Sequence, residues 1–334
     1  ETGQHNITPF GLDIHNPVFL ISGLSIVVFV FITLAFQADA TEFFGWLRPF
    51  LTSNFDWFFL ASANVFVLFS IFLMISPLGK IRLGGDDATP DYSYLGWFAM
   101  LFAAGMGIGL MFWSVAEPLA YYTDWYGTPL GVEPETRAAV TKALGATMFH
   151  WGLHPWAIYA LVGLSLAFFA YNHKMPLTIR SAFYPLLGER CWGWMGHVID
   201  TLAVLATIFG LATSLGLGAK QAASGLEFLF DIPATLNTQI AIITGVTAVA
   251  VISVIRGLDG GVRLLSNFNM TLAVLLLVFV VLVGSGIGIV GDVFQTAGAY
   301  VANIIPLSNW VGREDETWFH GWTVFYWAWW VSWS

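Results

Sequence analysis

The feature that most constrains this chain is a series of apolar blocks, each about 20 residues long, separated by short polar segments. A helix of about 20 apolar residues can cross the hydrocarbon core of a bilayer. The strands of a membrane barrel are only about 10 residues long, so these blocks are too long and continuous for them. We therefore predict an all-α polytopic membrane protein whose residues 1–334 form a single transmembrane domain. Its spans are expected near residues 17–36, 55–76, 94–122, 143–171, 193–222, 238–255, 268–290 and 320–334.

The charge distribution supports this class and predicts an orientation. Only 10% of the residues are charged, against about 25% in soluble domains. Loops on the cytoplasmic side of membrane proteins are enriched in Lys and Arg. We therefore expect a multi-pass protein of the inner (plasma) membrane with a cytoplasmic N-terminus. The loops after spans two, four and six carry seven of the twelve basic residues, namely Lys80, Arg82, Lys174, Arg180, Arg190, Arg256 and Arg263.

The net charge of −9 comes mostly from the alternate loops, which are acidic. This balance argues against a nucleic-acid partner, because such partners require basic surfaces. At the C-terminal end, the block 320–334 stops without a polar flank, and the chain does not begin with Met. We therefore expect this chain to be a fragment of a longer protein.

A glycine-rich stretch, AAGMGIGLMFWSVAEP (103–118), lies inside the third predicted span. Glycine costs roughly 1 kcal/mol relative to alanine in a helix interior, so two interpretations compete. Gly105 and Gly109 have the GxxxG spacing that permits close helix packing. Alternatively, Gly105, Gly107 and Gly109 mark a broken helix whose freed backbone faces a ligand near the midplane. Glu117 follows in the same span, either buried in a functional role or at the outer interface.

Tryptophan is unusually frequent, with sixteen residues, and falls into two kinds of position. Trp46, Trp57, Trp125 and Trp310 fit the aromatic belt of the membrane interface. Two clusters do not, HWGLHPWAIY (150–159) and YWAWWVSW (326–333). Aromatic rings inside a bundle either pack helices together or form a cage for a quaternary ammonium group, which binds π faces.

The same cluster holds two histidines at i, i+4 spacing, His150 and His154. This spacing can hold a metal ion on one helix face. However, a third ligand is not evident and the flanking residues are aromatic. We therefore predict polar contacts between helices and no metal site.

Together these stretches resemble the betaine/choline/carnitine transporter family of secondary transporters. The matching segments occur in family order and cover essentially the whole chain. They are AAGMGIGLMFWSVAEP, HWGLHPWAIY, MPLTIRSAFYPLLGER (175–190), ATIFGLATSLGLGAKQ (206–221) and FYWAWWVSWS (325–334).

The resemblance implies an architecture and an assembly. The family has the leucine-transporter-type fold of twelve spans, with two leading helices and two inverted five-helix repeats. Spans three to seven of this chain would form the first repeat, and the truncated eighth would open the second. The resemblance also implies a homotrimer in the lipid bilayer.

The resemblance further implies a substrate site for a quaternary-ammonium solute. The glycine segment would be unwound, so that backbone at Gly105, Gly107 and Gly109 approaches substrate and ion. Two tryptophans, Trp329 and Trp333, would line the adjoining pathway. The aromatic box itself would consist of Trp151, Trp156, Tyr159 and Trp330.

The coupling ion is open between Na⁺ and H⁺, and no other cofactor is implied. In sodium-coupled members one ion site matches Ala103 and Met106. A second uses two hydroxyls one turn apart, and Thr207 matches the first of these. Leu211 stands at the other position and offers no oxygen, which a hard cation requires. This departure puts the second sodium site in doubt.

We predict a symporter that imports glycine betaine by alternating access. Proton-coupled choline transport is the alternative, and carnitine or a sulfonium analogue is the third candidate substrate. Choline-transporting relatives often carry Asp where this chain has Gly109. A channel or an osmosensor that keeps the fold is the alternative of another class. The sequence carries no nucleophile–base arrangement, metal-ligand set or phosphate loop in its spans, so we do not expect an enzyme.

Overall fold

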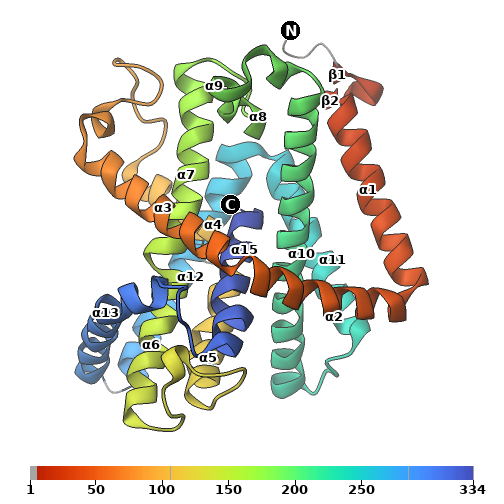
Figure 1. Cartoon of the computed structure of the whole chain (residues 1–334). Helices are drawn as coiled ribbons and strands as arrows, with labels where there is room; N and C mark the ends of the chain where they lie inside the picture. The colour runs from red at the N-terminus through yellow and green to blue at the C-terminus, as the bar shows by residue number, and fades with distance from the viewer. Residues whose placement is uncertain (1–5, 106, 285, 334) are drawn as a thin grey trace. The chain divides into compact units, whose positions relative to one another are not determined.

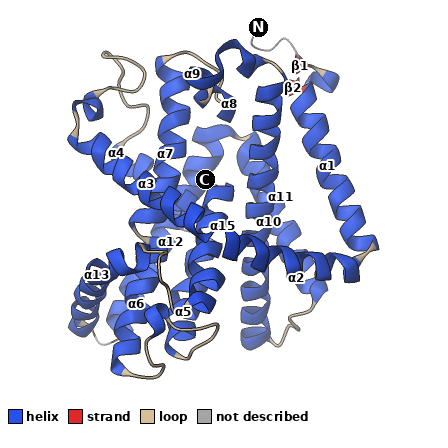
Figure 2. Ribbon diagram, viewed as in Figure 1, coloured by secondary structure: helices blue, strands red, loops and turns tan. Residues whose placement is uncertain are grey.

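The computed structural model describes residues 6–105, 107–284 and 286–333, with side chains described for all of these except Ile108, Ile287 and Trp333. Helices make up nearly all of this part of the chain (Figure 2). Two short strands, β1 (Asn6–Ile7) and β2 (Ile14–His15), pair antiparallel near the N-terminus. The prediction of an all-α protein is therefore confirmed.

The helices group into two compact units. The first unit comprises residues up to 88, residues 152–211 and residues from 308 onward. It contains α1 (Asn16–Ala35), α2 (Gln37–Asn54), α3 (Asp56–Ile75), α7 (Leu153–Ala167), α8 (Ile179–Ala182), α9 (Tyr184–Leu187), the beginning of α10 (Trp194–Phe230), α14 (Glu316–Trp318) and α15 (Phe325–Trp333). Its centre is formed by α3 and α7, which pack side by side, and α15 packs against both (Figure 1).

The second unit comprises residues 89–151 and 212–307. It contains α4 (Tyr94–Gly105), α5 (Ile108–Tyr122), α6 (Arg137–Trp151), the remainder of α10, α11 (Leu236–Ile255), α12 (Arg263–Val283) and most of α13 (Ile287–Ser308). Within this unit α4 packs against α12, and α5 packs against α6.

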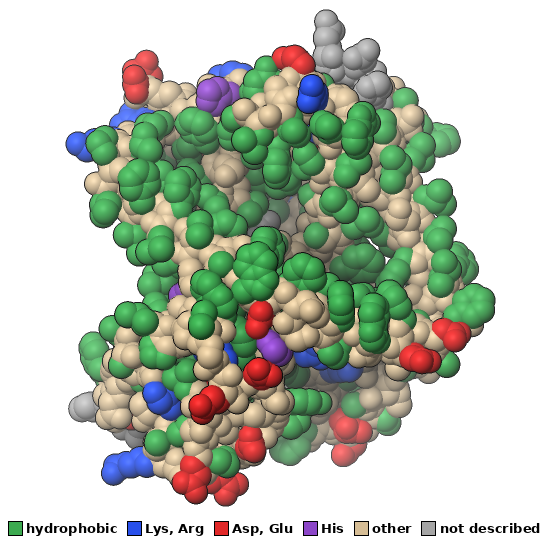
Figure 3. Space-filling model, viewed as in Figure 1, with side chains coloured by type: hydrophobic (Ala, Val, Ile, Leu, Met, Phe, Trp, Pro, Cys, Tyr) green, Lys and Arg blue, Asp and Glu red, His purple; other side chains and the backbone are tan. Residues whose placement is uncertain are grey.

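Most of the predicted spans correspond to long apolar helices. Among the described residues six helices are long and apolar enough to cross a membrane, and the bent pair α4–α5 would make a seventh. The six are Asn16–Ala35, Asp56–Ile75, Arg137–Asn172, Trp194–Phe230, Leu236–Ile255 and Leu258–Val283. The described part of the predicted span 320–334 falls in the π-helical segment Phe319–Val324 and in α15, which are not among them. Hydrophobic side chains cover much of the visible face in Figure 3, as expected for a surface that meets lipid.

Proline and glycine set several helix boundaries. Pro17 lies in the first turn of α1, where its missing N–H has no intrahelical partner to lose. The predicted fourth span is divided at Gly152, whose backbone leaves the helical region (φ −97°, ψ −131°) between α6 and α7. Pro155 consequently lies in the first turn of α7, where it costs no helical hydrogen bond. The break therefore lies at Gly152, three residues before this proline.

Candidate functional site

An aromatic cluster forms where α15 packs on α7, in the first unit. Trp156 and Tyr159 lie three residues apart on α7, with ring centroids 5.7 Å apart and planes at 81°. The ring of Trp330 on α15 lies 6.0 Å from that of Trp156, at 52°. Trp330 is fully buried, and the other two rings are partly buried. The three predicted box residues of this unit therefore lie together, in the tilted and edge-on arrangements that aromatic rings prefer.

A polar contact between helices holds α15 in register on α3 and α7. The ring of His154 on α7 stacks on Trp327 of α15, with centroids 5.5 Å apart and an interplanar angle of 15°. On the α3 side, Nε2 of His154 lies 3.0 Å from the Asn64 side-chain oxygen. Trp327 and Trp330 lie three residues apart on α15, so they are neighbours on one side of that helix. His154 thus serves the polar contact expected from the sequence.

Trp329 of α15 belongs to an aromatic row along that helix. Trp329 is buried, and its ring stacks 6.2 Å from Phe325, one turn earlier. It also lies 6.0 Å from Tyr326. The side chain of Trp333 lies outside the described ones, so its predicted place on the pathway is not addressed by this geometry.

The glycine segment is broken in the second unit. Helix α4 ends at Gly105 and α5 begins at Ile108, and the two helices are bent by 56°. Gly107 lies in the break with non-helical angles (φ −104°, ψ −142°). It lines a hollow of about 440 Å³ together with Met111 of α5 and side chains of α10, α11 and α12. Irregular backbone at membrane depth is tolerated where it lines a cavity. A Cβ at Gly107 would meet nothing within 4 Å, so close packing at this residue does not explain the break.

The predicted ion residues have the following positions. Ala103 is partly buried near the C-terminus of α4, and Met106 lies outside the described residues. The hydroxyl of Thr207 on α10 donates to the Ala203 carbonyl at 2.9 Å. Leu211, one turn later, is 49% exposed.

A buried carboxylate links α5 to α6 in the second unit. Glu117 of α5 is completely buried, so the structure places it in the interior rather than at the interface. Its Oε1 accepts a hydrogen bond from the Tyr121 hydroxyl at 2.8 Å and lies 2.7 Å from Nδ1 of His150. Its Oε2 accepts a hydrogen bond from Nε1 of Trp151 at 2.8 Å. Burying a carboxylate is costly unless such partners satisfy it.

This network contains residues that the sequence did not single out for this role. Tyr121 stands at i+4 from Glu117, the spacing of neighbours on one helix face, which was the available signal. His150 and Trp151 lie 33 and 34 residues further on, so their contact with Glu117 depends on the packing of α6 against α5. Trp151 belongs to the predicted box, and the structure assigns its indole N–H to the Glu117 carboxylate.

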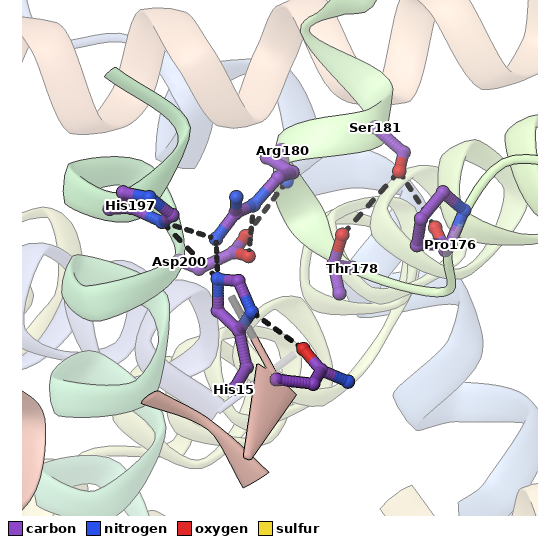
Figure 4. Close-up of polar contacts among 8 residues, drawn as sticks. His15, Pro176, Thr178, Arg180, Ser181, His197 and Asp200 are labelled. Carbon is purple, nitrogen blue, oxygen red and sulfur yellow. Dashed lines mark hydrogen bonds and ion pairs between the residues drawn. The ribbon is translucent and has the colours of Figure 1, made fainter. Parts of the chain in front are cut away.

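A second buried polar cluster joins the N-terminal strand pair to α8 and α10 within the first unit (Figure 4). Arg180 and Asp200 are both buried and form an ion pair at 2.5 Å between Nε and Oδ2. The Asp200 Oδ1 also accepts the backbone N–H of Arg180 at 2.9 Å. One terminal nitrogen of the Arg180 guanidinium lies 3.2 Å from ring nitrogens of both His15 and His197.

The turn beside this cluster requires a close backbone approach. A Cβ at Gly196, in the first turn of α10, would lie only 1.8 Å from the Cys191 carbonyl oxygen. Only glycine fits there, and it lets α10 begin directly against the turn Gly188–Trp192. Burial raises the pKa of the Cys191 thiol, so this side chain stays neutral beside the Arg180–Asp200 pair.

Comparison with known proteins adds an independent line of observation. The model of the betaine/carnitine/choline family of transporters matches residues 17–334. The chain is 60% identical to glycine betaine transporter 1 of Vibrio parahaemolyticus, over 99% of this chain and 64% of that protein. It is 57% identical to a glycine betaine/proline/choline/ectoine transporter of the same species, over 100% of this chain and 59% of that protein. A glycine betaine transporter of Bacillus subtilis is 45% identical, over 86% of this chain and 56% of that protein. The chain thus spans 56% to 64% of the length of these relatives.

Proposed function

Because this chain belongs to the betaine/carnitine/choline family of transporters, we propose that it imports a quaternary-ammonium osmolyte, with glycine betaine as the first substrate. The single observation that carries this proposal is the cluster of Trp156, Tyr159 and Trp330. A quaternary ammonium group has no N–H to donate, so it binds π faces in preference to hydrogen-bond acceptors. Each desolvated cation–π contact is worth about 2 kcal/mol.

Further residues complete the proposed site. The remaining box residue is Trp151, and the broken glycine segment with Gly105, Gly107 and Gly109 supplies backbone toward substrate and ion. Trp329 and Trp333 line the adjoining pathway in this proposal. The hollow at Gly107 supports the role of the break, because freed backbone groups there have space in front of them.

Glycine betaine is preferred over choline in this proposal because residue 109 carries no negative charge. Betaine carries its own carboxylate, whereas choline is a pure cation that gains from a carboxylate in the site. Gly109, in the first turn of α5, supplies none. Two of the relatives carry glycine betaine alone in their names, and the third carries choline as well. Choline is therefore the second candidate.

We further propose that transport is symport with sodium through the site that includes Ala103 and Met106. Thr207 retains one hydroxyl of a second site, but Leu211 removes the other, so this second site is lost in our proposal. The alternative is coupling to protons.

The proposed architecture is the leucine-transporter-type fold with inverted repeats, in which one group of helices rocks against another to alternate access. The protein assembles as a homotrimer in the inner membrane, with its N-terminus in the cytoplasm. A channel, the alternative of another class, requires a continuous polar pore, and the aromatic cluster of α7 and α15 argues against one.

The function is tested with paired tryptophan variants of the full-length protein. Trp330→Ala removes the buried ring that faces Trp156, whereas Trp57→Ala removes a ring that is 52% exposed on α3. We expect Trp330→Ala to raise the KM for glycine betaine at least about tenfold, the value of one strong cation–π contact. Trp57→Ala should leave it unchanged. Uptake is measured at equal surface expression, and equal uptake by the two variants would remove the aromatic box.

A further inference from the structure

The indole N–H of Trp151, a residue of the proposed box, donates to the buried carboxylate of Glu117. We infer that Glu117 is a positioning residue for substrate binding, which orients the Trp151 ring through the hydrogen bond from Nε1–H to Oε2. This inference rests on the proposed function, because it assumes that Trp151 contributes a face of the box. Glu117 itself does not touch the substrate in this scheme.

Trp151 needs an anchor because of its position in the chain. It is the last residue of α6, and the backbone leaves the helical region at Gly152. Because the helix stops here, the ring has no regular i+3 or i+4 neighbours from a following turn to pack against it. The indole N–H is a donor only, so one well-placed acceptor fixes the plane of the ring. At 2.8 Å, the carboxylate oxygen of Glu117 is within range for a charge-assisted hydrogen bond.

The other carboxylate oxygen of Glu117, Oε1, also has polar partners. Oε1 of Glu117 meets the Tyr121 hydroxyl from its own helix and His150 Nδ1 from α6. Glu117, Tyr121 and His150 are all completely buried. Two contacts from different helices determine the rotamer of Glu117, and this leaves Oε2 directed at Trp151. The two oxygens therefore have separable tasks, which substitutions can distinguish.

A purely structural role is the competing explanation, since the same carboxylate joins α5 to α6. Such a role predicts that loss of Glu117 lowers the thermal stability and the amount of active protein while KM stays constant. A positioning role predicts a change of KM at a nearly constant kcat. It also predicts that the effect disappears once Trp151 can no longer donate a hydrogen bond.

The test is a double-mutant cycle on glycine betaine uptake by the full-length protein in proteoliposomes. Glu117→Ala removes the acceptor, and Trp151→Phe keeps an aromatic ring but removes the donor. We expect each to raise KM about tenfold, the cost of one hydrogen bond to a charged group. The double variant should also show about a tenfold increase, whereas independent effects would multiply to about a hundredfold.

Two further variants separate the hydrogen bond from folding. Glu117→Gln keeps the volume and an oxygen for the indole N–H, so we expect its KM to return to within about threefold of the unaltered protein. Tyr122→Phe is the matched control, because it removes a hydroxyl from the same helix that donates to the Glu135 carbonyl and not to the carboxylate of Glu117. Its KM should stay unchanged even where its melting temperature falls.

The outcomes distinguish this inference from the function on which it rests. Multiplying effects in the double variant, a KM for Glu117→Gln as high as for Glu117→Ala, or a loss of kcat alone would each overturn the positioning role. In those cases uptake by the unaltered protein leaves the proposed function intact. An unaltered protein without saturable betaine uptake would overturn the proposed function, and the inference with it.

Discussion

At the scale of the residue, specificity in our proposal depends on whether a negative charge stands at position 109. Gly109 lies in the first turn of α5, directly after the break at Gly107. An acidic side chain is tolerated in the first turn of a helix, because it meets the positive end of the helix dipole. The position can therefore accept a carboxylate without loss of the helix.

We predict that Gly109→Asp raises the ratio of choline to glycine betaine uptake about tenfold. One added carboxylate near a desolvated cation is worth about 1 to 2 kcal/mol. Gly109→Asn is the matched control, since it has nearly the same shape without the charge. Competition between labelled glycine betaine and choline in proteoliposomes measures the ratio. An unchanged ratio in Gly109→Asp, or an equal change in both variants, would contradict the charge argument.

The contacts of Trp151 show which part of the site could not be predicted from the sequence. On an uninterrupted helix Trp151, Trp156 and Tyr159 would share one broad side. The break at Gly152 places Trp151 on α6 and the other two on α7. The residue types of the cluster were predictable, but the partner of Trp151 was not. Glu117 lies 34 residues away in the chain and meets it only through packing.

At the scale of the element, the broken helices follow from glycine more closely than from proline. The three glycines at 105, 107 and 109 predicted a break, and α4 ends at the first of them. Segment α2 was not predicted as a helix, because it carries charged residues and no apolar run. It is nevertheless helical over Gln37–Asn54. Hydropathy identifies helices that are apolar enough to cross a membrane. It does not identify a helix such as α2, which is stabilised by other contacts.

The short helix α8 shows that counting charged residues in a loop does not predict whether they are exposed. Arg180 counts toward the basic residues of a loop, but the structure buries it against Asp200 of α10. Figure 4 shows this pair between His15 of β2 and His197 of α10. Removing one member of a buried pair leaves the other charge without compensation, which is costly.

We predict that Asp200→Asn lowers the stability of the first unit by about 3 kcal/mol, because Arg180 stays buried without its counter-charge. Asp259→Asn is the control, since its ion pair with Arg263 is exposed. The Asp259 side chain is 73% accessible and the Arg263 side chain is 45% accessible. An exposed pair contributes at most about 1 kcal/mol. Thermal unfolding of the full-length protein in one detergent measures both. Equal melting temperatures for the two variants would show that the buried ion pair contributes no more to stability than the exposed one.

At the scale of the whole molecule, length and hydropathy were sufficient to predict a polytopic helical protein. Seven of the eight predicted spans coincide with helices that are apolar enough to cross a membrane, counting the bent pair α4–α5 once. Assembly into a homotrimer, orientation and ion coupling remain proposals, because they depend on surfaces and ligands beyond the contacts within one chain. The family match extends over residues 17–334.

The central claim is that this protein uses an ion gradient to accumulate a quaternary-ammonium osmolyte. The most direct measurement is uptake of labelled glycine betaine by proteoliposomes of the full-length protein, under an imposed sodium gradient and, separately, an imposed proton gradient. We predict accumulation driven by sodium and reduced by unlabelled choline. Accumulation driven by protons alone would move the coupling to the alternative without changing the class of substrate. No accumulation of glycine betaine under either gradient would contradict the claim.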